Sequence, residues 1–215
     1  MGKLCRDKPK NEELWVKARS NRGIGGSDAA AIVGASTWKT ANDLWLEKTG
    51  QKEPEDISDD PFVQQGRRME YAIRELYKAY HPDYKVKHNP YHLLYQSDRP
   101  WLFATLDGEV VLPDKRKGIL ECKTNTPVGK AGWAKWDCQI PRTYEVQLYH
   151  QMLATGFDFA DLVALLINQD GDFVVRTYRF ERSEHEEDLA WLLEKETEFW
   201  QSIQNRTLPP MTLVL

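Results

Sequence analysis

The chain has 215 residues, of which 41% are hydrophobic and 29% are charged, and its formal net charge at pH 7 is -4. A chain of this length and composition can bury one substantial core, so we expect a single domain over residues 1–215. The negative net charge excludes a general attraction to nucleic acid, so any binding of nucleic acid has to be local.

Membrane and disulfide-rich classes are also excluded by the sequence. No apolar run reaches the roughly 18 residues needed to span a membrane, and no apolar stretch follows the N-terminus, so we expect a cytoplasmic protein without membrane contacts. The cysteines are Cys5, Cys122 and Cys138, an odd number without a CxxC pair. This pattern argues against a disulfide framework, a structural zinc site or an iron-sulfur cluster.

The N-terminal part of the chain predicts an arm followed by short helices. Residues 1–18 are expected to form the arm, and residues 23–26 form a glycine-rich turn. Ser27 has the character of an N-cap residue, and Gly34 marks the end of the helix that follows it. Residues 40–50 repeat the pattern, with a threonine at the start and a glycine at the end.

A long helix is expected after the acidic loop at residues 51–60. Asp60 and Pro61 are typical of a helix start, and His81 followed by a proline is typical of its end. Between them, apolar side chains recur at helical spacing at Met69, Ile73, Leu76 and Tyr80.

The pattern then changes to strands. Residues 84–96, 101–112 and 119–124 predict an antiparallel meander, with the turn before the last strand at residues 113–118. Residues 125–139 are expected to form a loop rich in Gly, Lys and Trp.

The rest of the chain predicts a helix, a hairpin and a closing helix. The helix runs from about Pro141 to Gly156, and the hairpin pairs residues 161–168 with 173–180. A capping box formed by Ser183 and Glu186 predicts a closing helix over residues 183–205. This order of elements predicts an α/β or α+β fold with a central mixed sheet flanked by helices.

The stretch "GILECKT" places opposite charges on an otherwise apolar strand. Because side chains alternate along a strand, Glu121 and Lys123 share one face and Cys122 points to the other. The preceding turn is expected to bring Asp107 roughly opposite residues 123–124. Two carboxylates and an amine suit phosphodiester hydrolysis assisted by Mg²⁺, which binds carboxylate oxygens and activates water.

The alternative for this pattern is a cross-strand salt bridge on a solvated sheet face. The apolar surroundings favour a metal site, since unpaired charges at the end of a buried sheet are costly and a cation would offset that cost. Cys122 is expected to pack in the core, and its backbone carbonyl is a further candidate metal ligand.

A third carboxylate, Glu70, lies on the long helix at the border of its buried face. The alternative role of Glu70 is a surface ion pair with Arg67 or Arg74. Gly66 costs about 1 kcal/mol relative to Ala inside a helix, which indicates that something approaches the backbone there.

The glycine-rich turn is a candidate phosphate site. Backbone N–H groups, the Ser27 hydroxyl and Arg22 could surround an anion at the helix start, and a plain N-cap is the alternative. The stretch lacks the Gly-Lys-Ser/Thr ending of a P-loop, and Asp28 stands where a dinucleotide fingerprint has its last glycine, so no nucleotide cofactor is expected.

In the helix after residue 141, Tyr144, Gln147 and Gln151 share one face. Gln147 could orient a phosphate or a water molecule, or be a polar flank of the helix. Trp133 and Trp136 could contact DNA or pack inside an active-site loop.

Five stretches in this order resemble the lambda exonuclease and YqaJ viral recombinase family of phage and bacteria. They are "RGIGGSDAAAIVGASTWKTANDLWLEKTG", "QQGRRMEYAIRELY", "FATLDGEV", "GILECKT" and "IPRTYEVQLYHQMLATG", and the resemblance runs from about residue 19 to residue 156, which is most of the chain. The resemblance implies a PD-(D/E)xK nuclease core, similar to that of restriction endonucleases, and digestion of one strand of linear double-stranded DNA from its 5′ end.

The resemblance also implies roles for individual residues. Glu70, Asp107 and Glu121 correspond to the ligands of Mg²⁺, for which Mn²⁺ is a substitute, and Lys123 corresponds to the residue that positions the attacking water. Gln147 corresponds to the family's active-site glutamine. Tyr144 is included with the residues that face DNA, and Arg22 and Ser27 correspond to the 5′-phosphate site, with Arg19 as a rival to Arg22.

Two further implications concern assembly. The resemblance implies a homotrimeric ring around DNA and a single-strand annealing protein as a partner. The alternatives to the exonuclease activity are an endonuclease of restriction or repair type on the same fold, and a non-catalytic protein that binds DNA ends during recombination.

Overall fold

The structure is a computed structural model that describes residues 2–209. In chain order its elements are β1 (Leu4–Asp7), α1 (Glu12–Arg22), α2 (Gly26–Ile32), α3 (Ala41–Lys48), α4 (Pro61–Tyr80), β2 (Lys85–Lys87), β3 (Leu93–Gln96), β4 (Arg99–Ala104), β5 (Gly108–Val111), β6 (Lys117–Asn125), α5 (Gly129–Ala134), α6 (Arg142–Thr155), β7 (Phe159–Ile167), β8 (Phe173–Glu181) and α7 (Glu186–Asn205). No helix in this range is both long and apolar enough to cross a membrane.

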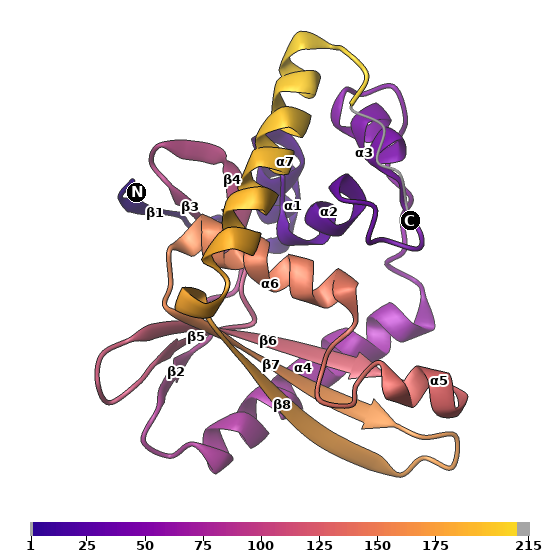
Figure 1. The fold of residues 1–215 in the computed structure, drawn as a ribbon, viewed down its shortest axis with the longest axis vertical. Coiled ribbons are helices and arrows are strands. Elements are labelled where there is room, and N and C mark those ends of the chain that lie inside the picture. The colour runs from indigo at the N-terminus through magenta and orange to yellow at the C-terminus, as the bar shows by residue number, and fades with distance from the viewer. Residues whose placement is uncertain (1, 210–215) are drawn as a thin grey trace.

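The central sheet confirms the predicted fold class. Its strand order is β2-β5-β6-β7-β8, in which β6 and β7 run parallel and the other neighbours run antiparallel. The helices α4 and α6 lie on opposite faces of this sheet (Figure 1). Alternation along β6 sends Ile119 into the core under α6, and Leu120 and Cys122 into the core under α4.

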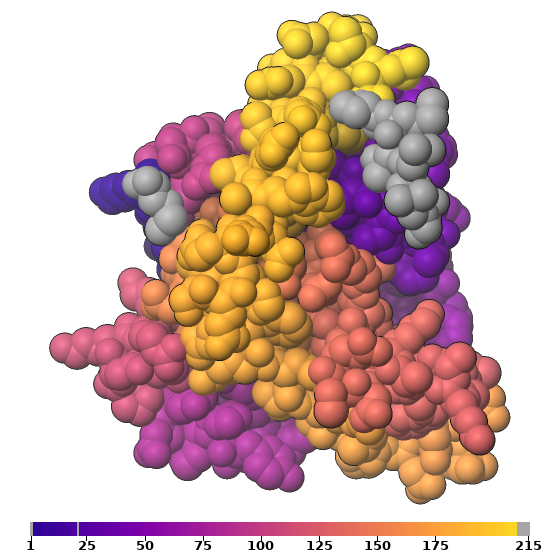
Figure 2. All heavy atoms as spheres, viewed as in Figure 1, coloured from indigo at the N-terminus to yellow at the C-terminus, as the bar shows by residue number. Residues whose placement is uncertain are grey.

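A second, three-stranded sheet has the order β1-β3-β4. Residues 1–18, expected as an arm, therefore contain a paired strand and the start of α1, because Cys5 lies opposite Tyr95 and Asn11 caps the helix by accepting from the N–H of Leu14 at 2.9 Å. Figure 2 shows α7 as a ridge that crosses the viewed face above the strands β7 and β8.

The stretch 101–112, expected as one strand, is divided between the two sheets. The strand β4 ends at Ala104, and β5 begins at Gly108 in the other sheet. Between them, the side-chain carboxylate of Asp107 accepts a hydrogen bond from the backbone N–H of Cys122 at 2.8 Å. The backbone carbonyl of Asp107 accepts a hydrogen bond from Nη1 of Arg74 at 3.1 Å. These side-chain contacts replace regular pairing, so the meander breaks at this point.

Helix boundaries follow the sequence signals in some places and not in others. The long helix begins at Pro61 after the cap Asp60, as predicted, and α6 is followed by Gly156 in the left-handed conformation with φ 72°. The prediction of Ser27 as a cap was wrong, because α2 begins one residue earlier and Gly25 is its N-cap.

Two other boundaries differ from the prediction. Residues 182–184 form a separate 3-10 turn, so the closing helix begins at Glu186 with His185 as its cap, and Ser183 does not cap it. The loop predicted at residues 125–139 contains the short helix α5.

Candidate active site

A cleft of about 550 Å³ lies beside the start of α4 and the end of β6. Among the residues that line it are Glu70, Asp107, Glu121, Lys123 and Tyr144. The structure therefore brings the three candidate carboxylates and the candidate lysine to one place, although they come from the helix α4, the strand β6 and the residue before β5.

Glu121 is the most enclosed of these carboxylates, with 3% of its surface exposed. Its Oε1 atom lies 2.7 Å from Nζ of Lys123 and accepts from Nε2 of Gln147 at 2.6 Å. Lys123 also donates to Oε1 of Gln147 at 3.0 Å. The lysine, glutamine and glutamate thus form a closed triangle of contacts, and Gln147 is part of the site and not a solvated flank of its helix.

Asp107 lies nearer to Glu121 than predicted. Gly108 pairs with Leu120 and Val111 pairs with Lys117, so the same register continued by one residue places Asp107 beside Glu121 and not opposite residues 123–124. The cause is that the turn is shorter than the one expected at residues 113–118, because the N–H of Leu112 already donates to the carbonyl of Arg116 at 3.0 Å.

The charges in the cleft shift one another's pKa values. Burial raises the pKa of Asp107 well above its usual range, and the neighbouring carboxylates Glu121 and Glu70 raise it further. Burial lowers the pKa of Lys123, but the attraction of Glu121 and Asp107 outweighs burial and raises it overall. The carboxylates therefore repel one another, and one ammonium only partly compensates for them.

Glu70 lines the cleft and also forms an ion pair. Nη1 of Arg74 lies 3.0 Å from Oε1 of Glu70 and also donates to the carbonyl of Asp107 at 3.1 Å. Arg74 is 6% exposed, so this guanidinium is a buried connection between α4 and the residue before β5. The two roles considered for Glu70, cleft carboxylate and partner of Arg74, occur together.

The donor set of the cleft fits a hard cation such as Mg²⁺. Each carboxylate keeps acceptor capacity, because Asp107 and Glu70 each use one oxygen in the contacts above, and the repulsion around Asp107 would be relieved by a cation. Within residues 2–209, however, no three His, Cys, Asp or Glu side chains are arranged so that they could already hold a metal ion. Binding would therefore require small side-chain movements.

Cys122 faces away from these groups. Its side chain is 9% exposed and packs with Ile73 and Leu120 in the core under α4. Burial raises the pKa of its thiol far above the usual range, and Asp107 adds to the effect, so the thiol stays protonated and only the backbone carbonyl is a candidate ligand.

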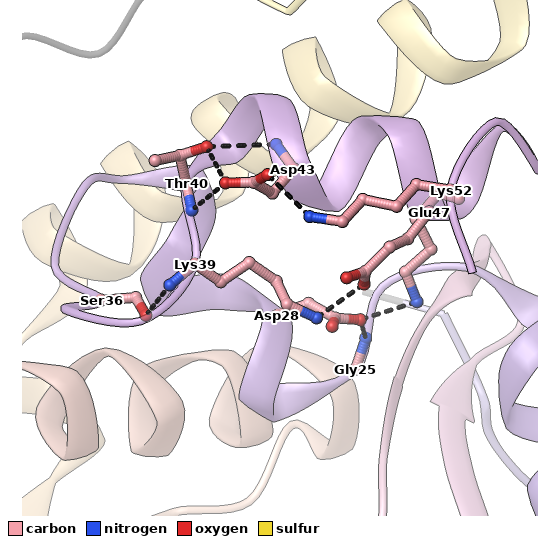
Figure 3. A network of polar contacts seen from close by, with 9 residues as sticks. Gly25, Asp28, Ser36, Lys39, Thr40, Asp43, Glu47 and Lys52 are labelled. Atoms are coloured by element: carbon pink, nitrogen blue, oxygen red, sulfur yellow. Dashed lines mark hydrogen bonds and ion pairs between the residues drawn. The ribbon is translucent and has the colours of Figure 1, made fainter. Parts of the chain in front are cut away.

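A second hollow of about 540 Å³ contains the candidate phosphate residue Ser27. It is also lined by Arg19, Lys39 and Lys48, but not by Arg22. Figure 3 shows the polar network along its wall, in which Lys39 lies 2.6 Å from Glu47. The lysine Lys48 lies 2.8 Å from Asp28, whose carboxylate accepts from the N–H of Gly25 at 3.0 Å.

Arg22 lies elsewhere. Its guanidinium pairs with Asp7 and lies 4.2 Å from the centre of the Tyr95 ring, beside a separate hollow lined by Trp101 and Trp200. Burial lowers the pKa of Arg19, Asp28 raises it, and the positive charge of Arg67 lowers it further. Because Arg67 lines the first cleft, the two hollows are close enough for their cations to interact.

The aromatic residues near the cleft have different roles. Tyr144 lines the cleft, and Nζ of Lys123 lies 4.9 Å from the centre of its ring. Trp136 is 1% exposed and packs against Tyr144 and Tyr178, while Trp133 packs on the same core. Of the two roles considered for Trp133 and Trp136, contact with DNA and packing inside the loop, the structure shows packing.

Two buried residues in contact with the site, Arg74 and Gln151, had no role in the sequence prediction of the site. Gln151 donates to Oε2 of Glu121 at 2.7 Å. The available signal was spacing, since Arg74 follows Glu70 and Gln151 follows Gln147 by one helical turn.

The family described as the YqaJ-like viral recombinase domain matches residues 14–158. A curated relative, the uncharacterized protein YqaJ of Bacillus subtilis strain 168, is 29% identical over 203 residues, which are 92% of this chain. The chain spans 58% of the length of that relative.

Solved structures share the fold. A crystal structure of the alkaline exonuclease LHK-Exo from Laribacter hongkongensis in complex with dAMP has a TM-score of 0.67 and 20% identity, with 91% of this chain and 94% of that chain covered. Another structure of LHK-Exo has a TM-score of 0.66 and 16% identity over the same shares of the two chains. A phage related exonuclease from Haemophilus somnus 129PT has a TM-score of 0.58 and 14% identity, with 86% of this chain and 96% of that chain covered.

Proposed function

The chain belongs to the YqaJ-like viral recombinase domain family, and on this premise we propose that it is a metal-dependent exonuclease that digests one strand of linear double-stranded DNA from the 5′ end. The observation that carries the proposal is the convergence of Glu70, Asp107, Glu121 and Lys123 in one cleft. The exonucleases that share the fold support the proposed reaction.

Glu70, Asp107, Glu121 and the backbone carbonyl of Cys122 would hold Mg²⁺, or Mn²⁺ in its place. A bound divalent cation supplies Lewis acid chemistry, which activates water and screens the charge of the phosphodiester. Lys123 would hold the attacking water, since its ammonium stays charged beside Glu121. Gln147 would orient that ammonium through its side-chain oxygen.

The 5′ phosphate would bind in the second hollow. Arg19 supplies positive charge there and Ser27 supplies a hydroxyl, while Lys39 and Lys48 line the hollow in ion pairs with carboxylates. Arg22, the other candidate from the sequence, is held by Asp7 outside this hollow. An anion between Arg19 and Arg67 would also relieve the repulsion between the two guanidinium groups.

The wider biology follows from the family as a proposal. The substrate is the end of linear duplex DNA, residues 1–215 act as one nuclease domain, and the protein acts in the cytoplasm of a bacterial or phage-infected cell. We further propose a homotrimeric ring around DNA and a single-strand annealing protein as a partner in recombination. Enclosure by a ring would reduce the need for a strongly basic surface, in keeping with the net charge of -4.

Digestion of linear duplex DNA, with and without a 5′ phosphate, tests the proposal. Wild type should degrade the phosphorylated duplex only with Mg²⁺, and Lys123→Ala should lose this activity. Equal rates for the variant and wild type would refute the assignment of the cleft. Cleavage of covalently closed circles would instead favour an endonuclease, and end binding without cleavage would favour a non-catalytic recombination protein.

A further inference from the structure

Gln151 is a buried polar residue that contacts the site from behind. It lies on α6, one turn after Gln147, and is 2% exposed. It does not line the cleft, so it would not touch DNA there. Its side chain is nevertheless directed at a candidate catalytic group.

The contact is a hydrogen bond from Nε2 of Gln151 to Oε2 of Glu121 at 2.7 Å. The other oxygen, Oε1, is occupied by Gln147 and Lys123. The two amides of α6 thus hold one oxygen each, which fixes the carboxylate against rotation about its last bond, a torsion that is otherwise soft. Oε2 has this one donor among the described residues, so it retains an acceptor site for a cation.

The contact with Glu121 distinguishes a glutamine from an apolar side chain at this position. Within the described part of the chain, Oε1 of Gln151 is buried and has no hydrogen-bond partner. A buried amide oxygen without a partner is unfavourable, whereas an apolar side chain of similar size would avoid this cost. The feature that an apolar side chain could not supply is the N–H directed at Glu121.

The surroundings keep Gln151 in place. The helix α2 packs on this face of α6 at Gly26, where an added Cβ would lie 3.6 Å from Cγ of Gln151 and 3.3 Å from Cγ of Gln147. The absence of a side chain at Gly26 therefore lets α2 cover both glutamines closely, which restricts their rotation.

We propose that Gln151 is a positioning residue that orients the Glu121 carboxylate for binding the catalytic cation. The proposal rests on the proposed nuclease function, because it assumes that Glu121 is a metal ligand. Residues that orient metal ligands typically change metal affinity or activity by about 10- to 100-fold when they are removed.

Gln96 offers a matched control for the test. It is also 2% exposed, also donates through Nε2, to the carbonyl of Thr155 at 2.8 Å, and also has a buried Oε1 without a partner among the described residues. Gln151→Met and Gln96→Met each remove one buried amide of the same kind, but only the first lies against Glu121.

The experiment measures Mg²⁺ binding by calorimetry without DNA, together with kcat and KM on linear duplex DNA and the melting temperature. Gln151→Met should weaken Mg²⁺ binding and lower kcat by about 10-fold or more with little change in KM, while Gln96→Met leaves Mg²⁺ binding and kcat as in wild type. If Gln151→Met does not fold, Gln151→Asn keeps the amide but shortens the side chain by one carbon, and it should show the same loss.

The possible failures can be told apart. Wild-type Mg²⁺ affinity and kcat in the Gln151 variant, alongside an inactive Lys123→Ala, would overturn the positioning role and leave the proposed function intact. An equal loss in Gln96→Met would show that burial of an amide matters and its contact with Glu121 does not. A fully active Lys123→Ala would remove the proposed function itself.

Discussion

Nζ of Lys123 lies 2.7 Å from Oε1 of Glu121, two residues earlier on the same strand. Alternation along β6 places both side chains on the face covered by α6, so the pair is enclosed by the helix and not hydrated on an open sheet. Lys123 and Arg74 together do not neutralise the three carboxylates Glu70, Asp107 and Glu121. The remaining repulsion leads to the first prediction.

Asp107→Asn should make the metal-free protein more stable and abolish cleavage. Burial and, next, the neighbouring carboxylates raise the pKa of Asp107, so its ionised form destabilises the fold at neutral pH. Removing the charge should raise the melting temperature in EDTA by about 2–4 °C, and Mg²⁺ should then stabilise the variant less than wild type. A lower melting temperature than wild type in EDTA would contradict the repulsion.

Gly66→Ala should separate stability from function. An added Cβ at Gly66 has no protein atom within 4 Å, although Gly66 lines the cleft. Denaturant unfolding should show a gain of about 0.5–1 kcal/mol, because Ala favours the helix. If DNA approaches the backbone at this point, KM for duplex DNA should rise, whereas an unchanged KM would show that the space is not used.

Arg19→Ala and Arg22→Ala distinguish the two candidates for the 5′ phosphate. Arg19 lines the hollow that contains Ser27, whereas Arg22 pairs with Asp7. We expect Arg19→Ala to lower the preference for phosphorylated over unphosphorylated ends by about 10-fold or more, which corresponds to one lost charge-assisted hydrogen bond. Arg22→Ala should retain the preference, and the reverse result would return the site to Arg22.

His150 should make stability depend on pH. Burial lowers its pKa, but Glu196 at 2.6 Å and the more distant Asp28 outweigh burial and raise it above the usual 6.5. Nε2 of the ring lies 2.9 Å from the carbonyl of Phe103, so a charged ring satisfies both contacts.

When the pKa of a histidine is higher in the folded state than in the unfolded state, its protonation stabilises the fold fully at pH values below the unfolded-state pKa. This contribution is lost as the pH rises through the folded-state pKa. Urea unfolding of wild type should therefore show falling stability above about pH 6.5, the ordinary pKa of histidine. His150→Gln should show a flatter dependence, and parallel curves for the two proteins would rule out this charged pair as the source.

Asp161 provides a test of a buried ion pair that does not line the cleft. This carboxylate is 1% exposed, and Arg179 donates to it at 2.6 and 2.7 Å while the Tyr77 hydroxyl donates as well. Arg179→Met should cost about 3 kcal/mol of unfolding free energy by leaving a buried charge unpaired. Tyr77→Phe should cost only about 1–2 kcal/mol, because Arg179 remains, and equal losses would contradict this order.

The sequence predicted the local features of the fold because their causes lie within a few residues. Asp60 and Pro61 begin α4, Gly156 ends α6, and alternation along residues 119–123 separates Glu121 from Cys122. The family resemblance likewise depended on short stretches in a fixed order, and the match to the family confirms it.

Other predictions failed where another contact, local or distant in sequence, competes with the expected one. Ser27 has good N-cap chemistry, but Asp28 accepts from the N–H of Gly25, so the helix begins earlier. The stretch 101–112 has the sequence pattern of one strand. In the structure, Arg74 and Cys122 bind Asp107, and the stretch is divided there between two sheets. Neither partner is near in sequence.

The sequence by itself thus determined which chemical groups the chain carries and which faces of its helices and strands they occupy. Only the tertiary structure decided that Asp107 lies beside Glu121, that Arg19 and not Arg22 shares a hollow with Ser27, and that Gln151 holds the second oxygen of Glu121. The reason is physical: propensity, capping and alternation act over one or two turns, whereas register and the composition of a cleft depend on how separate elements pack.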